Sequence, residues 1–180
     1  MGKFFITSGP SGVGKTTLME AIESRHEGRV ATPVSYTTRQ PREGEIDGKH
    51  YHFISEDEFN NKLGEGAFIE WAKVYGNMYA VGKSPVLETT RNYDRSYAIL
   101  NYDGAKQFRA ISWPATYIFT APTSLSALEK RLYSRGHSNN TPHRIREAKA
   151  ELATRHNYDY VIINDEFDKA VEELEEVMGL

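Results

Sequence analysis

A glycine-rich segment near the amino terminus contains residue types that bind phosphate groups. Residues 9–16 read Gly-Pro-Ser-Gly-Val-Gly-Lys-Thr and fit the pattern G-x-x-x-x-G-K-[ST]. Because glycines tolerate positive φ, successive N–H groups of such a loop can turn inward around phosphate oxygens. Lys15 can reach the β- and γ-phosphates of a nucleotide, and the Thr16 hydroxyl can ligate Mg²⁺. The predicted nucleoside triphosphate site consists of Gly9, Ser11, Gly12, Val13, Gly14, Lys15, Thr16 and Thr17.

A second group of polar residues lies further along the chain. Arg39, Arg42, Tyr51 and Tyr79 are cationic or phenolic donors in short segments. If this region folds as a small sheet, the four side chains could converge on one anion. Arginine suits that role because its planar guanidinium meets phosphate oxygens in a bidentate way.

Glu70 lies in an apolar segment, between Ile69 and Trp71. A carboxylate costs free energy when it is buried without a partner, so a buried Glu70 would need a functional reason. The partial alternation of apolar and polar residues favours a simpler interpretation, in which Glu70 points to solvent from one face of a strand. Periodicity alone therefore predicts no chemical role for this residue.

The segments that must position these residues indicate an α/β protein. Both ends of the chain alternate strand and helix, which predicts a parallel core sheet covered on both faces. The middle, at residues 33–82, is mostly strand and resembles an insertion. Strands are expected at residues 4–6, 30–38, 51–54, 68–75, 78–81, 97–100, 115–120 and 160–163. Helices are expected at residues 17–25, 55–63, from 84–85 onward, after a turn at Asp103-Gly104, and at 123–133, 141–156 and 167–178.

The composition narrows the class of protein. A chain of 180 residues is long enough for one domain with its own core. The net charge of −3 gives no basic footprint of the kind that nucleic-acid binders carry. Cysteine is absent, which excludes disulfides and thiolate metal sites. No apolar run approaches the length of an export signal or a membrane span, so we expect a cytoplasmic protein without a membrane partner.

The order of several motifs resembles the guanylate kinase family over nearly the whole chain. The most specific segment is residues 35–45, which read Ser-Tyr-Thr-Thr-Arg-Gln-Pro-Arg-Glu-Gly-Glu. The glycine-rich loop precedes it. The remaining matches are Asp-Gly-Lys-His-Tyr-His-Phe at 47–53, Phe-Ile-Glu-Trp-Ala at 68–72, Tyr-Gly-Asn at 75–77, Arg-Leu-Tyr-Ser-Arg-Gly at 131–136 and Asn-Tyr-Asp-Tyr-Val-Ile-Ile-Asn-Asp at 157–165.

This resemblance implies a P-loop NTPase three-layer fold with an inserted, mostly-β lobe that binds a nucleoside monophosphate and with a helical lid. It implies transfer of the γ-phosphate of ATP to GMP or dGMP, with Mg²⁺ as cofactor, in a monomer or homodimer. The expected divisions of the single domain are a core at residues 1–32, 83–130 and 157–180, a GMP-binding lobe at 33–82 and a lid at 131–156.

The resemblance also implies roles for individual residues and reverses the solvent-facing interpretation of Glu70. Glu70 would accept hydrogen bonds from the N1–H and the amino group of guanine, and Ser35 would contact O6. Arg39, Arg42, Tyr51 and Tyr79 would hold the GMP phosphate, and Asn101 would complete the GMP site. The implied catalytic residues are Lys15, Arg39, Arg42, Arg135 and Arg144.

Three features depart from the family pattern. Val81 stands where a threonine hydroxyl is usual near the guanine, which removes one hydrogen bond worth on the order of 1 kcal/mol. Asn101 occupies the place of a usual aspartate, with Asp103 two residues later. The segment at residues 135–144 is shorter than usual, which affects the expected lid.

Two alternatives to GMP phosphorylation remain open at this stage. The first is a related P-loop kinase whose acceptor has changed to another nucleotide or a phosphosugar, an idea motivated by Val81 and Asn101. The second is a catalytically weak binding module that uses the fold as a scaffold. The intact glycine-rich loop argues against the second, and Glu70 with Ser35 argues against the first.

Overall fold

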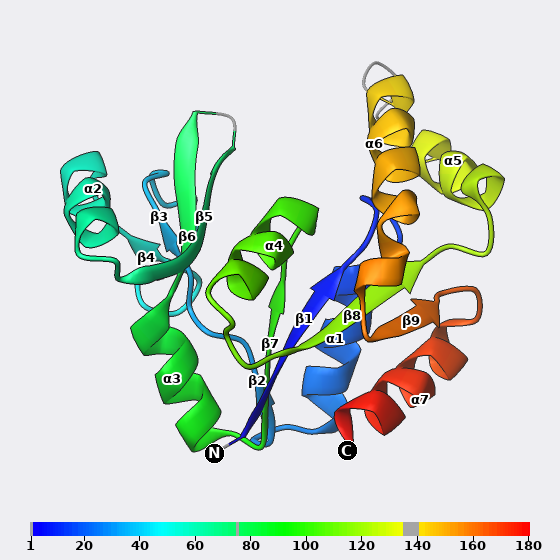
Figure 1. Cartoon of the computed structure of the whole chain (residues 1–180), viewed down its shortest axis with the longest axis horizontal. Coiled ribbons are helices and arrows are strands. Elements are labelled where there is room, and N and C mark those ends of the chain that lie inside the picture. Colours follow the sequence, from blue (N-terminus) through cyan, green and yellow to red (C-terminus); the bar gives the residue numbers. More distant parts are fainter. Residues whose placement is uncertain (1, 75, 135–140) are drawn as a thin grey trace.

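A five-stranded parallel sheet forms the centre of the molecule. The computed structural model describes residues 2–74, 76–134 and 141–180. The strand order is β2-β7-β1-β8-β9, and each neighbouring pair in this sheet is parallel. The predicted parallel core sheet is thus confirmed (Figure 1). The strands are β1 (Lys3–Ser8), β2 (Val30–Ala31), β7 (Arg95–Ile99), β8 (Thr116–Ala121) and β9 (Tyr160–Ile163).

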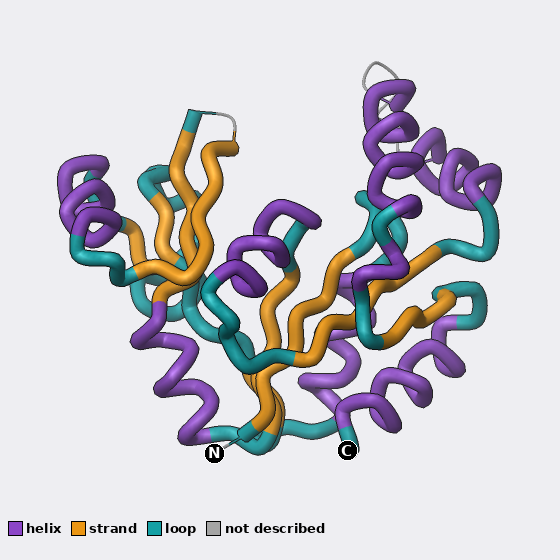
Figure 2. The backbone as a smooth tube through the Cα atoms, in the orientation of Figure 1, coloured by secondary structure: helices purple, strands orange, loops and turns teal. Residues whose placement is uncertain are grey.

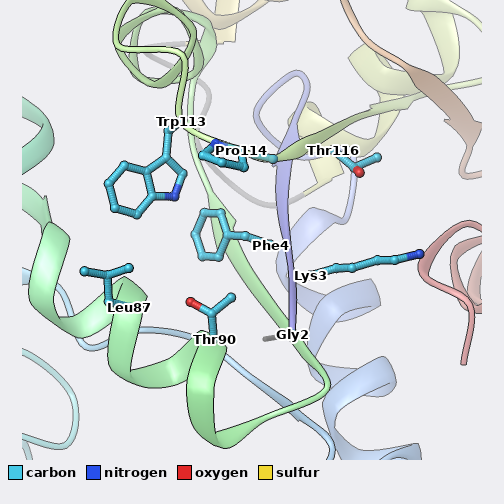
Figure 3. Close-up of a pocket in the computed structure, with 9 residues that line it drawn as sticks. Gly2, Lys3, Phe4, Leu87, Thr90, Trp113, Pro114 and Thr116 are labelled. Atoms are coloured by element: carbon cyan, nitrogen blue, oxygen red, sulfur yellow. The ribbon is translucent and has the colours of Figure 1, made fainter.

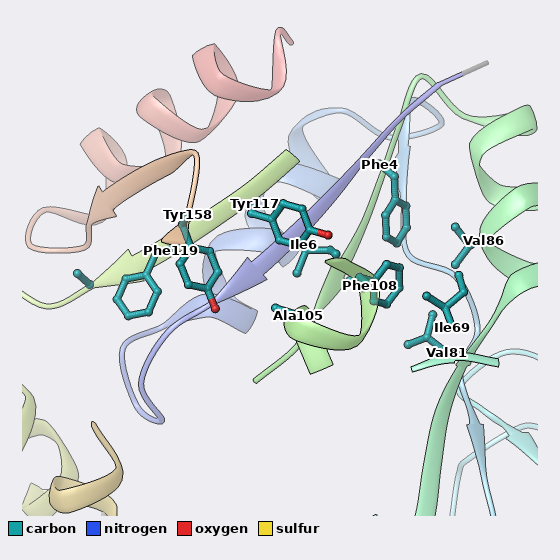
Figure 4. Packing of buried hydrophobic residues seen from close by; sticks show 12 residues of the cluster. Phe4, Ile6, Ile69, Val81, Val86, Ala105, Phe108, Tyr117, Phe119 and Tyr158 are labelled. Carbon is teal, nitrogen blue, oxygen red and sulfur yellow. The ribbon is translucent and has the colours of Figure 1, made fainter. Parts of the chain in front are cut away.

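Helices cover both faces of this sheet, which gives three layers. Successive side chains of a strand point to opposite faces, and the central strand β1 is buried on both. Phe5 packs in the cluster formed with α1 (Lys15–Arg25) and α7 (Phe167–Met178). Phe4 and Ile6 pack in the opposite cluster (Figure 4), together with α3 (Lys83–Asn92) and α4 (Tyr102–Ala110).

A second, smaller sheet is built within residues 36–82. Its order is β4-β3-β6-β5, with β3 parallel to β4 and antiparallel to β6, and β5 antiparallel to β6. Helix α2 (Glu56–Gly64) packs on it, and the predicted cap forms because Glu58 N–H donates to Ser55 Oγ at 3.1 Å. The strands are β3 (Tyr36–Thr37), β4 (His52–Phe53), β5 (Phe68–Val74) and β6 (Asn77–Gly82).

Helices α5 (Leu125–Ser134) and α6 (Thr141–Ala153) stand on the side opposite the small sheet, with α4 between the two (Figures 1 and 2). A short 3₁₀ helix, η2 (Arg155–Asn157), links α6 to β9. Across the described ranges, no helix is both long enough and apolar enough to cross a bilayer.

Two local predictions were wrong. The single strand expected at residues 30–38 is two strands, β2 and β3, which belong to different sheets. Pro33 lies between them and cannot donate a ladder hydrogen bond, which suits a crossing between sheets. The turn expected at Asp103-Gly104 is the first turn of α4, because Asn101 Oδ1 accepts from Gly104 N–H at 2.8 Å and caps the helix.

Helix α4 joins the two sheets. Phe108 is 0% exposed, and its ring stacks on Phe4 with centroids 5.8 Å apart. The same cluster contains Ile69 and Val81 from the smaller sheet. Gln107 extends the junction, since its amide accepts from Trp71 N–H at 3.1 Å and donates to Trp71 C=O at 3.0 Å. At the outer edge of the small sheet, the backbone of β5 therefore bonds to the Gln107 side chain instead of to another strand.

Because Phe108 fills this junction completely, Phe108→Ala should lower the free energy of unfolding by about 3–5 kcal/mol. The matched control is Ile111→Ala at the end of the same helix, where the side chain is 49% exposed and the expected change is within about 0.5 kcal/mol. Urea denaturation measures both. Equal destabilisation by the two variants would contradict the central position of Phe108.

Candidate functional site

The glycine-rich loop leaves the carboxyl end of β1 and leads directly into α1. Gly9, Gly12 and Gly14 have φ of 139°, 83° and 101°, a region that other residues rarely adopt. The first bond of the helix runs from Leu18 N–H to Gly14 C=O at 3.0 Å. The N–H groups at the start of α1 therefore lack intrahelical acceptors, and together with the helix dipole they are suited to bind an anion.

Buried contacts from α5 and from Asn164 hold this loop. Val13 packs against Leu128 and Leu132 of α5. Asn164, just after β9, donates from Nδ2 to Val13 C=O at 2.7 Å. A Cβ on residue 14 would lie 2.5 Å from the same nitrogen, so this contact requires glycine there. Sequence reasoning missed Asn164, although it lies in the Asn-Asp pair that closes the motif at residues 157–165.

The Lys15 side chain folds back over the glycine-rich loop. Its amine donates to Gly9 C=O and to Pro10 C=O, the latter at 3.0 Å. Burial lowers the pKa of Lys15, and the nearby carboxylate of Glu151 on α6 acts in the opposite direction. A cation is thus held in a partly desolvated position, where it interacts more strongly with an anion than it would in water.

A cavity of about 260 Å³ lies between the two sheets, and it contains most of the residues predicted to bind GMP. Strands β5 and β6 supply one wall and the end of β7 supplies the other. Its polar side chains are Ser35, Tyr51, Glu70, Tyr79 and Asn101, and its apolar walls are Ala72, Val74, Ala80, Val81, Ile99 and Leu100.

Glu70 is buried in this cavity wall and is only 7% exposed. The solvent-facing interpretation from periodicity was wrong. A register irregularity between Phe68 and Glu70 interrupts the alternation, so that Phe68, Ile69 and Glu70 are all buried. The carboxylate packs against α4, where a Cβ on Gly104 would lie 3.0 Å from Glu70 Oε1. Burial raises the pKa of Glu70 to about 7.

Arg39 lies beside the two tyrosines that line this cavity. Arg39 makes a bidentate ion pair with Glu45, at 2.8 and 2.9 Å, and its guanidinium lies 5.6 Å from the centre of the Tyr51 ring. Tyr51 and Tyr79 are in edge contact, with ring centroids 6.0 Å apart. The bond to Glu45, and then that to Tyr79, raises the pKa of Arg39. The structure thus brings Arg39, Tyr51 and Tyr79 together.

Glu45 organises the residues around Arg39, and sequence reasoning gave it no role. Besides pairing with Arg39, it accepts from Arg42 N–H at 2.7 Å. These two contacts hold the pKa of Glu45 down at about 2. Arg42 itself is exposed, and it is joined to the cluster through its backbone. The position of Glu45 six residues after Arg39 in the most specific motif was the available signal.

A second cavity, of about 350 Å³, connects the loop to the first cavity. It is lined by Thr16, Glu20 and Glu23 of α1, and it shares Ser35, Val81, Ile99 and Leu100 with the cavity that contains Glu70. The two spaces meet at the carboxyl end of β7, which is where open parallel sheets bind ligands. Thr16 supplies an exposed hydroxyl here, and this oxygen suits a magnesium ion that also contacts phosphate.

Of the two predicted lid arginines, the structure describes only Arg144. Arg135 lies outside the described residues. Arg144 lies in the first turn of α6, which is the outer end of that helix in Figure 1. Arg131, at the end of α5, instead donates to Asn164 C=O at 3.3 Å. Helix α5 is therefore bonded to the same residue that holds the glycine-rich loop.

A larger cavity, of about 610 Å³, lies at the other end of the sheet (Figure 3). Gly2, Lys3 and Phe4 line it at the start of β1, and Thr116 lines it at the start of β8. Phe4, Leu87 and Trp113 make it mostly apolar. It lies at the amino ends of the parallel strands and contains none of the residues predicted to bind ligand, so its size does not make it the candidate site.

Comparisons with known proteins agree with this geometry. The family model described as Guanylate kinase matches residues 1–179. A guanylate kinase from Maricaulis maris is 41% identical, covering 98% of this chain and 82% of the relative. One from Shewanella violacea is 38% identical, covering 96% and 84%. The crystal structure of guanylate kinase from Anaplasma phagocytophilum aligns with a TM-score of 0.70 and 27% identity, over 99% of this chain and 85% of that one. This chain belongs to the guanylate kinase family.

Proposed function

We propose that the protein transfers the γ-phosphate of ATP to GMP or dGMP and so forms ADP and the nucleoside diphosphate. The single observation that carries this function is the cavity lined by the buried carboxylate of Glu70 and by Tyr51 and Tyr79, with the guanidinium of Arg39 lying against the Tyr51 ring. A purine monophosphate presents N–H donors at its base and negative charge at its phosphate. The cavity is complementary to both ends of such a ligand.

Base selection follows from Glu70. An ionised carboxylate has only acceptors, so it matches the N1–H and amino group of guanine. Adenine has an acceptor at N1, and binding it would leave the buried carboxylate without partners, which discriminates strongly. Ser35 lines the same cavity and would meet O6 with its hydroxyl. Arg39, Tyr51 and Tyr79 would hold the phosphate, with Arg42 closing over it from the exposed loop.

Transfer of the phosphoryl group depends mainly on alignment of the two nucleotides and on neutralisation of their charge, and it needs no general base. The attacking oxygen belongs to an ionised phosphate, so no proton has to be removed. Lys15 and the N–H groups at the start of α1 would hold the β- and γ-phosphates of ATP, while Arg39 and Arg42 would screen the acceptor. Thr16 would hold Mg²⁺, which neutralises phosphate charge when bound.

Closure of the lid would complete the site. We propose that residues 131–156 move toward residues 33–82 over the core, bringing Arg135 and Arg144 to the transferring group. Val13 and Ala148 share one apolar cluster, which couples α6 to the loop that holds ATP. Closure would also exclude water, which otherwise would accept the phosphoryl group. This reaction belongs to purine nucleotide metabolism, for which we expect a cytoplasmic location.

Replacement of Glu70 tests the acceptor. Glu70→Gln exchanges one acceptor oxygen for a donor, so kcat/KM for GMP should fall about 30- to 1,000-fold, while the KM for ATP stays within about twofold. A coupled ADP-release assay with ATP, Mg²⁺ and GMP, dGMP, AMP, IMP, CMP or UMP measures this. The control is Glu88→Gln, an exposed carboxylate of α3. Equal loss for every acceptor, or no preference of the parent protein for GMP over AMP, would refute the proposal.

The same substitution should stabilise the protein at high pH. The pKa of Glu70 is about 7 in the folded state and near 4.5 when unfolded, so the native state binds more protons between these values. The free energy of unfolding therefore falls as the pH rises from about 4.5 to about 7, and the loss is complete above the folded-state pKa. In Glu70→Gln this loss is absent, and the variant should exceed the parent protein by about 2–3 kcal/mol at pH 8 and by little at pH 5. Urea denaturation at both pH values checks the difference.

Asn164 provides a separate test of the ATP half of the site. Asn164→Ala removes the bond to Val13 C=O and opens space beside Gly14, so the loop should lose its fixed conformation. We expect the KM for ATP to rise about tenfold, with little change in the KM for GMP. Asn60→Ala, at an exposed position of α2, is the control. A change confined to the KM for GMP would show that Asn164 does not act through the loop.

A further inference from the structure

Strand β9 lies at an edge of the core sheet and presents apolar side chains to solvent. It is the last strand in the order β2-β7-β1-β8-β9, and over the described ranges no further strand pairs with its outer side. Tyr160, Val161 and Ile163 are 40–47% exposed, and so is Phe167 at the start of α7. Large apolar side chains that gather on one surface are typical of an interaction site.

The backbone of β9 directs hydrogen-bonding groups to its outer side. Asn164 N–H, just beyond the end of β9, donates to the last carbonyl of β8 at 2.8 Å. Backbone groups of every second residue point to the same side of a strand, so Tyr160 and Ile162 also bond toward β8. Val161 and Ile163 therefore direct their N–H and C=O groups outward, where the backbone of another strand can reach them.

The sequence of β9 lacks the features that usually keep edge strands from pairing. Such strands commonly carry a charged side chain, a proline or a bulge. Residues 160–163 read Tyr-Val-Ile-Ile, and their register with β8 is regular. The opposite edge strand, β2, has only two residues, Val30 and Ala31. Of the two edges of the core sheet, β9 is therefore the one that can accept a further strand.

Two copies of β9 can pair with each other about a two-fold axis at Ile162. In an antiparallel pair, residues that exchange both of their hydrogen bonds lie directly opposite each other. Val161 of one copy then faces Ile163 of the second copy, and symmetry generates the same pair again. The Ile163 C=O accepts from Asp165 N–H at 3.1 Å and keeps a second lone pair for this pairing.

The same register brings the exposed side chains together. Val161 and Ile163 project to the face of the sheet opposite Ile162, which packs in the cluster with α7. Side chains directly opposite each other in a sheet have Cβ atoms about 4.5–5.5 Å apart, so Val161 of each copy would contact Ile163 of the other. The two residues that expose backbone groups are thus also residues that expose apolar surface. A second β9 covers both kinds of group and is itself covered in return.

We propose that two copies of this chain associate by antiparallel pairing of their β9 strands, which joins the two core sheets into one. This inference does not rest on the proposed function. Strand β9 lies on the side of the core away from the small sheet (Figure 1), so the pairing leaves the cavity that contains Glu70 open. Because β9 has only four residues, the interface is small, and we expect a Kd on the order of 10–100 µM.

Sedimentation equilibrium tests the proposal. The parent protein should change from one chain to two across this concentration range and stop at two, because a two-fold interface closes on itself. Val161→Lys sets a charge against Ile163 of the second copy and should raise the Kd at least tenfold. Adding Ile163→Glu to the same chain opposes the introduced charges in this register, so the double variant should recover the parent Kd within about threefold. Val161→Lys combined with Ile163→Lys should stay monomeric.

Ile111→Lys, at an exposed position beside the end of α4, is the matched control and should leave the Kd unchanged. Amide hydrogen exchange in residues 158–166 should slow with concentration in the parent protein and not in Val161→Lys. A parent protein that stays monomeric at ten times the highest expected Kd would leave this edge to a different chain and overturn the inference. Growth beyond two chains, equal weakening by Ile111→Lys, or no recovery on adding Ile163→Glu to Val161→Lys would overturn it as well.

Discussion

The parallel pairing of β1 with β7 and β8 is the constraint on which the rest of the structure depends. Parallel strands end at one edge of a sheet, so segments far apart in sequence emerge together. The glycine-rich loop follows β1, Asn101 follows β7 and Asn164 follows β9. The ATP loop, the cap of α4 and the amide that holds the loop therefore gather at one edge. The residues that line both cavities at the end of β7 extend this arrangement into the smaller sheet.

Helix α4 connects the core sheet to the cavity that contains Glu70. Its cap comes from the core strand β7, while its first turn supports the carboxylate of a residue in β5. Phe108 and Gln107 fasten the helix to both sheets. The Glu70 carboxylate can lie this close to α4 because residue 104 is a glycine and has no Cβ. The Glu70 carboxylate is consequently positioned by the same framework that positions the glycine-rich loop.

The buried Glu70 carboxylate lowers the stability of the folded protein when it is ionised. Glu70 is buried without a cationic partner among the described residues, which raises the pKa of its carboxyl and disfavours the charged form. Beside Tyr51, Glu45 holds Arg39 in place through two hydrogen bonds. The Glu70 carboxyl is thus desolvated by burial, whereas the Arg39 guanidinium is held by an internal ion pair.

Much of the architecture could be predicted from the sequence, because it depends on local rules. The loop at residues 9–16, the cap at Ser55 and the alternation of strands with helices follow from glycine φ preferences, capping chemistry and hydrophobic periodicity. Resemblance to a family supplied the grouping of Glu70 with Arg39. Only the tertiary structure decided that Glu70 is buried, since a register irregularity in β5 interrupts the alternation. It likewise decided that the Asn101 side-chain oxygen caps α4, which leaves its amino group free of that bond. It also decided that Asn164 holds the loop, because that contact joins residues 151 positions apart, a separation that no local pattern can encode.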